Sequence, residues 1–197
     1  MPPPDPDPDR DLVARAQAGD TRAYDALILK HGDRLFGLIF QMTGSREDTH
    51  DLLQDTFAKG YQALKRFRGT ASFSTWIHQI AVNLTLNHLK RRQRRTAVSL
   101  DELEQSGGTD SAMADSSLQA DPERTAFLAE LQKKLNNALA GLSEPHRLVV
   151  TMFDIEGMPH AEIARILKVS EGTVRSRLHY AHLQLQAALE EEWKNRH

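Results

Sequence analysis

The chain has 197 residues, enough for one average domain or two small ones. Apolar residues make up 40% of it, and its mean hydropathy of -0.52 is typical of a globular protein in water. It contains no cysteine, which excludes disulfides and thiolate metal sites and fits a cytoplasmic location. No apolar run approaches the roughly 18 residues of a membrane-spanning helix.

The net charge of -2 conceals two segments of opposite sign. Residues 65–95 contain eight Lys or Arg and no Asp or Glu, whereas residues 101–123 contain seven Asp or Glu and no Lys or Arg. A basic segment followed directly by an acidic one favours nucleic-acid binding by the first and a separate role for the second.

The elements expected in the first half of the chain are helices. Residues 1–9 are rich in Pro and Asp and lack the features of a signal peptide, so we expect a disordered tail. Helical spacing of apolar residues predicts a short helix over 12–18 and a long one that ends near Gly44. Ser45 opens the next helix as its N-cap, with Asp48 at the capping-box position. A loop at 66–72 leads into a helix over 73–95.

Acidic residues form a stripe on the helix that Ser45 opens. Asp48, Asp51 and Asp55, with Gln54 beside them, lie opposite the apolar residues of that helix. A carboxylate stripe repels DNA, so we expect it to face a basic protein surface. Acidic runs of this kind are also common on solvated helix faces.

The helix over 73–95 has a polar side that suits nucleic acid. Gln79, Asn83, Asn87, Lys90 and Arg94 share this side. Amides read base edges, and a basic helix end holds phosphates. The alternative is a solvated face.

Trp76 lies near the same side of this helix, which leaves two alternatives for it. It stacks on an unpaired base, or it belongs to the core.

The second half of the chain begins with a change of composition. Residues 96–124 contain Gly107-Gly108, several Ser and Asp and little apolar content, which predicts a flexible acidic linker. Helical spacing resumes beyond it. We therefore predict an all-α fold with two small helical domains, at 10–95 and 125–192, joined by this linker.

A helix-turn-helix is predicted at 159–178. Pro159 suits the first turn of its first helix, and Ser170 is a natural N-cap for the second. Apolar residues of the second helix share one face, and the opposite face carries Gly172, Arg175, Ser176, His179 and Tyr180, with Arg177 on the flank. Arg reads guanine bidentately, and Ser or His contacts several base edges. The alternative is an ordinary helical hairpin with solvated charges.

These segments together resemble the extracytoplasmic-function (group IV) sigma factors of the bacterial sigma-70 family. The resemblance covers about three quarters of the chain and is carried by Ala23–Met42, Asp48–Phe57, Phe67–Ile77, Ile80–Asn83 and Leu142–Arg147, followed by the helix-turn-helix. Two departures are visible. Thr49-His50 stands where Ala-Glu is common in the acidic motif, and Tyr180 stands where Arg is frequent, which leaves the recognised bases open.

The resemblance implies a bipartite, non-catalytic subunit of RNA polymerase. Its N-terminal domain would dock on the clamp helices of the β′ subunit through Asp48, Asp51, Gln54 and Asp55. Its loop at 66–72 would capture a flipped-out base of the −10 element. Residues for that element would be Arg66, Arg68, Trp76, Asn83, Asn87, Lys90, Arg91 and Arg94.

The C-terminal domain would bind the flap of the β subunit and read the −35 element. Its contacts would come from Thr173, Arg175, Ser176, Arg177, His179 and Tyr180. An anti-sigma factor is a further implied partner. No cofactor or metal is expected, and with up to roughly 3.5 Å per residue the linker is long enough to span two helical turns of DNA.

Two other functional classes were weighed from the residues. A stand-alone helix-turn-helix regulator would have no use for the acidic stripe or for the loop and basic helix. An enzyme would need a catalytic or phosphate-binding motif, and none is present. His179 and His182 are spaced i, i+3 but have no carboxylate at metal-ligand spacing.

Overall fold

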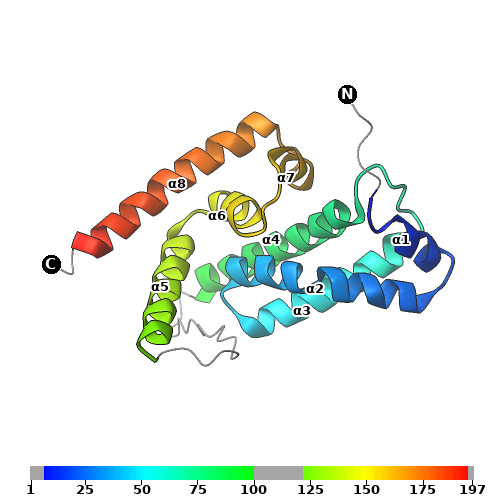
Figure 1. Cartoon of the computed structure of the whole chain (residues 1–197), viewed down its shortest axis with the longest axis horizontal. Helices are drawn as coiled ribbons and strands as arrows, with labels where there is room; N and C mark the ends of the chain where they lie inside the picture. The colour runs from blue at the N-terminus through cyan, green and yellow to red at the C-terminus, as the bar shows by residue number, and fades with distance from the viewer. Residues whose placement is uncertain (1–6, 100–121, 195–197) are drawn as a thin grey trace.

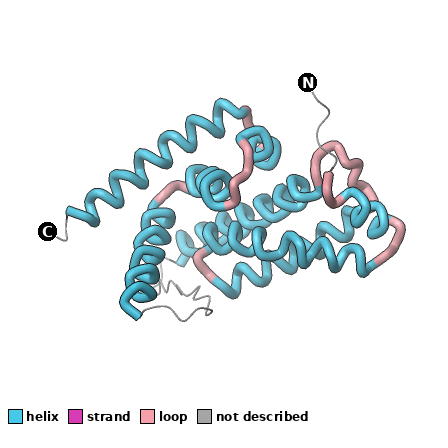
Figure 2. Tube along the Cα trace, viewed as in Figure 1, coloured by secondary structure: helices cyan, strands magenta, loops and turns pink. Residues whose placement is uncertain are grey.

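The computed structural model describes residues 7–99 and 122–194, and within these ranges Figure 2 shows helices and loops without strands. The N-terminal domain consists of α1 (Arg10–Gln17), α2 (Thr21–Thr43), α3 (Arg46–Leu64) and α4 (Phe73–Ser99). The C-terminal domain consists of α5 (Pro122–Gly141), α6 (Glu144–Val150), the short π-helix η1 (Thr151–Ile155), α7 (His160–Leu167) and α8 (Glu171–Lys194) (Figure 1). The predicted all-α class with two helical domains is confirmed.

Local capping residues fix the turn between α2 and α3. Gly44 ends α2 in the left-handed region with φ 65°, a conformation that favours glycine. Ser45 Oγ accepts a hydrogen bond from the backbone N–H of Asp48 at 3.2 Å, as its N-cap position predicts. At the other end of α2, Asp20 accepts from the backbone N–H groups of Arg22 and Ala23.

The core of the N-terminal domain is built where α2, α3 and α4 cross. Leu27, Leu35 and Ile39 of α2 are fully buried, as are Phe73 and Ile77 of α4. Between them, α3 presents a glycine rather than a side chain, which lets the helices approach closely.

Gly60 is the residue at this close approach. A Cβ atom there would lie 2.7 Å from Ile77 Cδ1 and 2.8 Å from the Tyr24 hydroxyl. Tyr24 is held in place because its hydroxyl donates to the Phe57 carbonyl at 2.6 Å. We expect Gly60→Ala to lower the free energy of unfolding by about 1–3 kcal/mol, because the buried neighbours must move. Urea unfolding followed by circular dichroism measures this loss.

The matched control is Gly37→Ala in α2. Gly37 has nothing within 4 Å of an added Cβ, and alanine is the better helix former, so we expect a gain of up to about 1 kcal/mol. Equal effects of the two substitutions would mean that Gly60 is not closely packed.

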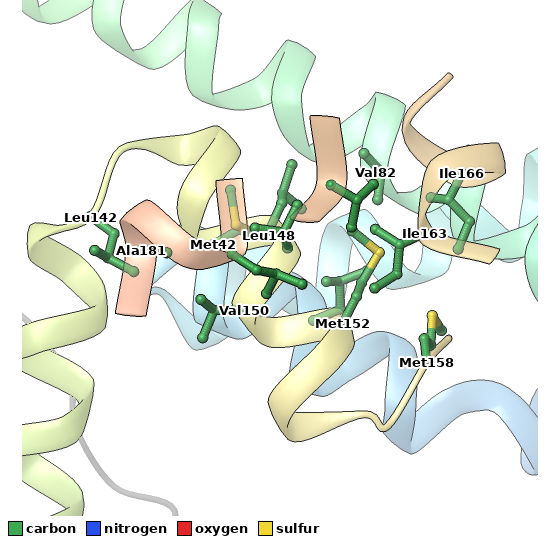
Figure 3. Close-up of a cluster of buried hydrophobic side chains, with 14 of the residues drawn as sticks. Met42, Val82, Leu142, Leu148, Val150, Met152, Met158, Ile163, Ile166 and Ala181 are labelled. Carbon is green, nitrogen blue, oxygen red and sulfur yellow. The ribbon is translucent and has the colours of Figure 1, made fainter. Parts of the chain in front are cut away.

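The two domains pack against each other and share a hydrophobic cluster. Met42 of α2 and Val82 of α4 lie among Leu148, Met152 and Ile163 of the C-terminal domain (Figure 3). All five side chains are at most 3% exposed. The expectation of two domains separated by a linker did not include this shared cluster. Residues 100–121 of the predicted linker lie outside the described residues, and the linker ends at 96–99 and 122–124 are helical.

Polar contacts accompany the shared cluster. Thr75 Oγ1 donates to Glu162 Oε1 at 2.7 Å, and the His78 Nε2 and Glu156 Oε2 atoms lie 3.2 Å apart. Arg34 Nη2 donates to the Glu156 carbonyl at 2.7 Å. Helix α4 therefore contacts the C-terminal domain through both apolar and polar side chains.

The predicted disordered tail is wrong for its last three residues. Residues 1–6 lie outside the described residues, but Asp9 is only 1% exposed and its Oδ2 lies 2.7 Å from His31 Nε2. A carboxylate buried beside a histidine and a lysine (Lys30) is a structural element rather than part of a tail. None of the described helices is both long enough and apolar enough to cross a membrane.

Candidate nucleic-acid interface

The exposed face of α8 begins directly after a fixed turn. Lys168 ends α7 in the left-handed region, and Ser170 Oγ accepts the backbone N–H of Thr173 at 3.1 Å, so the predicted N-cap is confirmed. Val174 and Leu178 point into the core and are at most 4% exposed. Because 3.6 residues make one turn, burial of these two residues turns the positions between them outward.

Four residues that were predicted to read DNA are exposed on this outward face: Arg175, Ser176, His179 and Tyr180. The Arg175 guanidinium lies 3.1 Å from Glu171 Oε2 on the preceding turn, and Ser176 Oγ donates to the Thr173 carbonyl at 3.0 Å. Thr173 and Arg177 are half-buried. The six predicted residues therefore lie within two to three turns of one helix, a compact surface that fits a major groove.

The polar side of α4 is exposed along most of its length. Asn83, Asn87, Lys90, Arg91 and Arg94 are all exposed. Towards the start of the helix, however, Gln79 is half-buried and donates to the Arg165 carbonyl of α7 at 3.3 Å. The C-terminal domain therefore covers the beginning of this side and leaves its basic end accessible.

The loop between α3 and α4 presents cations beside an aromatic cluster. Arg66 and Arg68 are exposed. Trp76 is half-buried, with ring centroids 4.9 Å from Phe67 and 5.7 Å from Phe73. Of the two alternatives for Trp76, the structure shows packing at the edge of the core.

The acidic stripe on α3 divides into two parts. Asp51, Gln54 and Asp55 are exposed. Asp48 instead faces α4, where its carboxylate oxygens lie 3.4 Å from His88 Nε2 and 3.7 Å from Arg92 Nη1. The exposed stripe therefore consists of the other three residues, and Asp48 links α3 to the basic end of α4.

Burial lowers the pKa of two groups, Arg147 at the contact between the domains and His31 in the N-terminal domain. Arg147 donates to the Leu139 and Leu142 carbonyls and also to the Met42 carbonyl of α2. Its burial lowers the pKa of the guanidinium, an effect that Glu144 partly offsets. Burial likewise lowers the pKa of His31, and the contact with Asp9 opposes this shift. In the described part of the chain, no group of three His, Asp or Glu side chains could hold a metal ion.

Sequence reasoning missed the carboxylates that contact α4 from the other domain. Glu156 precedes the helix-turn-helix and Glu162 lies in its first helix, but they contact His78 and Thr75 of α4. Their spacing gives no sign of a partner more than 75 residues away, so only the packing of the domains identifies them.

Comparison with known proteins identifies both domains. Residues 27–95 match the family model of sigma-70 region 2, and residues 132–185 match that of sigma-70 region 4. The RNA polymerase sigma-H factor of Pseudomonas aeruginosa is 35% identical over 184 residues, which cover 92% of this chain and 93% of that protein. The chain belongs to the sigma-70 family, in its extracytoplasmic-function (ECF) group. This sigma factor is not an enzyme.

Other relatives agree with this placement. The ECF RNA polymerase sigma-E factor of Escherichia coli K12 is 34% identical to this sigma factor over 172 residues, 85% of this chain and 86% of that protein. The solved structure of CnrH in complex with the cytosolic domain of CnrY has a TM-score of 0.66 and 26% identity and covers 93% of this chain and 97% of that chain. RpoE from Bartonella quintana, in complex with the anti-sigma factor NepR, shares the fold with a TM-score of 0.67, 21% identity and coverage of 85% and 96%.

Proposed function

We propose that this sigma factor binds core RNA polymerase in the cytoplasm, directs it to promoters with −35 and −10 elements, and helps to open the DNA. The observation that carries the proposal is the exposure of two separate polar surfaces, on α8 and on α4, in a chain that also exposes an acidic stripe. A stand-alone DNA-binding regulator would need only the first of these surfaces.

The α8 surface is assigned to the −35 element, with contacts from Thr173, Arg175, Ser176, Arg177, His179 and Tyr180. The support is geometric, because the capped N-terminus and the exposed polar face belong to the same first turns of α8. Phosphates are favoured at a helix N-terminus, and base edges are read from the following turns.

The α4 surface and the preceding loop are assigned to the −10 element, with contacts from Arg66, Arg68, Trp76, Asn83, Asn87, Lys90, Arg91 and Arg94. Cations that neutralise phosphates supply affinity, and the exposed amides suit base edges. The half-buried Trp76 contributes the edge of its ring beside the cationic loop, because its position against Phe67 and Phe73 is fixed by packing.

The exposed carboxylates of α3 are assigned to the polymerase. Asp51, Gln54 and Asp55 would contact the β′ clamp helices, and Asp48 would hold the stripe against α4. The C-terminal domain would contact the β flap. We also propose a partner of the anti-sigma class. The support is that CnrH, 26% identical to this chain, was solved with the cytosolic domain of CnrY, and that RpoE from Bartonella quintana, which shares the fold, was solved with the anti-sigma factor NepR.

Simultaneous reading of two elements requires the domains to separate. The elements would lie about two helical turns, roughly 70 Å, apart on DNA. In the structure the domains share a cluster, and α7 covers the beginning of the α4 surface. We therefore infer that the structure is a closed arrangement and that polymerase or DNA binding must open it.

Run-off transcription tests the proposal directly. Purified sigma factor and core enzyme would be incubated with a genomic DNA library, and the transcripts would be sequenced. We expect specific start sites, preceded by a shared pair of upstream motifs. Absence of start-site selection, together with a failure to bind core enzyme, would overturn the proposal.

Arg175→Ala tests the assignment of α8. We expect promoter binding to weaken by about 1–3 kcal/mol, chiefly at one base pair of the upstream element, because Arg reads guanine with two hydrogen bonds. Gln184→Ala, at an exposed position further along the same helix, should leave binding unchanged. Fluorescence anisotropy with single-base variants of the element measures both. An equal loss on every variant would assign Arg175 to phosphate alone.

A further inference from the structure

The N-terminal segment 7–17 contacts both ends of the loop at 65–72. The first contact is made by Asp7, whose Oδ2 accepts the backbone N–H of Phe73 at 2.8 Å, 66 residues further along the chain. Phe73 is the first residue of α4, and its N–H has no acceptor within that helix. Asp7 thus caps the N-terminus of α4, the helix that follows the loop.

The second contact is at the start of the loop. Gln17 Nε2 donates to the carbonyls of Leu64 and Phe67, both at 2.9 Å. Leu64 is the last residue of α3, where helix carbonyls lack intrahelical partners. One side-chain amide therefore fixes the path of the chain as it leaves α3.

Asp9 anchors the segment between these two contacts. Its buried carboxylate contacts His31 and Lys30 of α2, and its backbone N–H donates to Asp7 Oδ1 at 3.1 Å. The His31 ring lies 5.5 Å from that of Phe73. The position of Asp7 is therefore fixed through Asp9 and His31, which lie next to the buried start of α4.

We propose that Asp7, Asp9 and Gln17 form a brace that positions the 65–72 loop for capture of an unpaired promoter base, an inference that rests on the −10 function proposed for this loop. The three side chains act through the loop and not by touching DNA, so they are positioning residues. With both ends of the loop fixed, its exposed part, including Arg66 and Arg68, loses less conformational freedom when DNA binds.

We expect the brace to affect binding to unpaired −10 DNA and no other step of initiation. The side-chain hydrogen bonds of Asp7, Asp9 and Gln17 go to α2, to the start of α4 and to the chain leaving α3, and not to α8. Asp51, Gln54 and Asp55 of the acidic stripe are exposed on α3. Loss of a brace contact should therefore weaken binding to unpaired −10 DNA and leave −35 binding and polymerase assembly intact. A merely structural role would lower all three together.

Asp7→Ala and Gln17→Leu test this in the full-length chain assembled with core enzyme. One probe is a single-stranded oligonucleotide with the non-template −10 sequence of a promoter found by run-off transcription. The other is a duplex that carries only its upstream element. Each variant should bind the single strand about threefold to tenfold more weakly, the range expected for one hydrogen bond. The affinity of each variant for the duplex should stay within about twofold of the wild-type affinity, a change smaller than the loss of one hydrogen bond would cause.

Two further variants serve as controls. Asp7→Asn keeps one oxygen that can accept the Phe73 N–H and replaces the oxygen that accepts the Asp9 N–H by an NH2 donor. It should therefore restore part of the single-strand binding that Asp7→Ala loses. Asp11→Ala removes a carboxylate from α1, the helix that also carries Gln17. The Asp11 side chain is 84% exposed, so the substitution should change the binding of neither probe.

The outcomes separate the brace from the function on which it rests. Unchanged single-strand binding by both variants, or equal losses on the two probes, would overturn the brace. Failure of the wild-type protein to select a start site would instead overturn the proposed −10 function. Thermal unfolding of each variant is measured first, and binding is then assayed at a temperature at which every variant is folded.

Discussion

Replacing Asp51 and Asp55 together by lysine is expected to abolish the assembly of this sigma factor with core RNA polymerase. Both carboxylates are exposed and lie one turn apart on α3, so the double substitution changes the charge of this surface by four units. Close charge pairs across protein interfaces contribute more than 1 kcal/mol each, and reversal replaces attraction by repulsion. We expect affinity for core enzyme to fall about 100-fold or more, on the scale of two such pairs.

Size-exclusion chromatography and run-off transcription with core enzyme measure this loss. Asp25→Lys with Asp33→Lys is the matched control, since both carboxylates are exposed on the neighbouring α2 and the charge change is identical. Neither double variant should unfold the protein, because substitutions at exposed sites typically change stability by about 0.5 kcal/mol or less. If both double variants still bind core enzyme normally, the stripe is not the docking surface. If both fail equally, net charge and not the stripe controls assembly.

Elements fixed by neighbouring residues were predictable from sequence. The ends of α2 and α3 follow from Gly44 and Ser45, and the start of α8 follows from Ser170. In each case the capping residue and the backbone groups at the helix end that it affects lie within a few residues of each other in the sequence. The outward face of α8 was equally predictable, because burial of Val174 and Leu178 determines it through helical periodicity.

Features that depend on distant partners were not predictable in this way. Asp7 and Asp9 lie in a Pro- and Asp-rich stretch whose composition is typical of disorder, yet they contact residues of α2 and α4. Met42 and Val82 fit the apolar faces of their helices, but periodicity does not reveal that the C-terminal domain covers them. In a single sequence, a carboxylate that caps a distant helix cannot be distinguished from a solvated carboxylate. An apolar residue at a domain interface likewise cannot be distinguished from one in the core of its own domain.

The closed arrangement leaves the α8 surface exposed but covers part of α4, the two surfaces that we assign to DNA. The outward residues of α8 are exposed, whereas the C-terminal domain covers the beginning of α4. Glu162 and Arg165 of α7 contact Thr75 and Gln79, and Glu156, which follows η1, contacts His78. Two of these contacts use carboxylates, from Glu162 and Glu156. The beginning of α4, the helix that we assign to the −10 element, therefore faces two carboxylates in the closed arrangement. We expect DNA to be able to approach this part of the helix once the domains separate.

Val82→Asp is expected to open the domains without unfolding either one. Val82 is 3% exposed and belongs to the cluster that is formed mainly by the C-terminal domain. A carboxylate left there without a partner would destabilise the closed arrangement by about 3–5 kcal/mol, whereas separation exposes it to water. Small-angle X-ray scattering should show a larger radius of gyration, and circular dichroism should show unchanged helix content.

Asn83→Asp is the matched control for this variant. It adds the same charge at the next residue of α4, which is exposed, so the particle should stay compact. Because opening uncovers the beginning of α4, Val82→Asp should also bind single-stranded DNA more tightly than wild type in the absence of polymerase. A compact Val82→Asp protein with lowered stability would show instead that Val82 belongs to the N-terminal core and that the domains do not part at this surface.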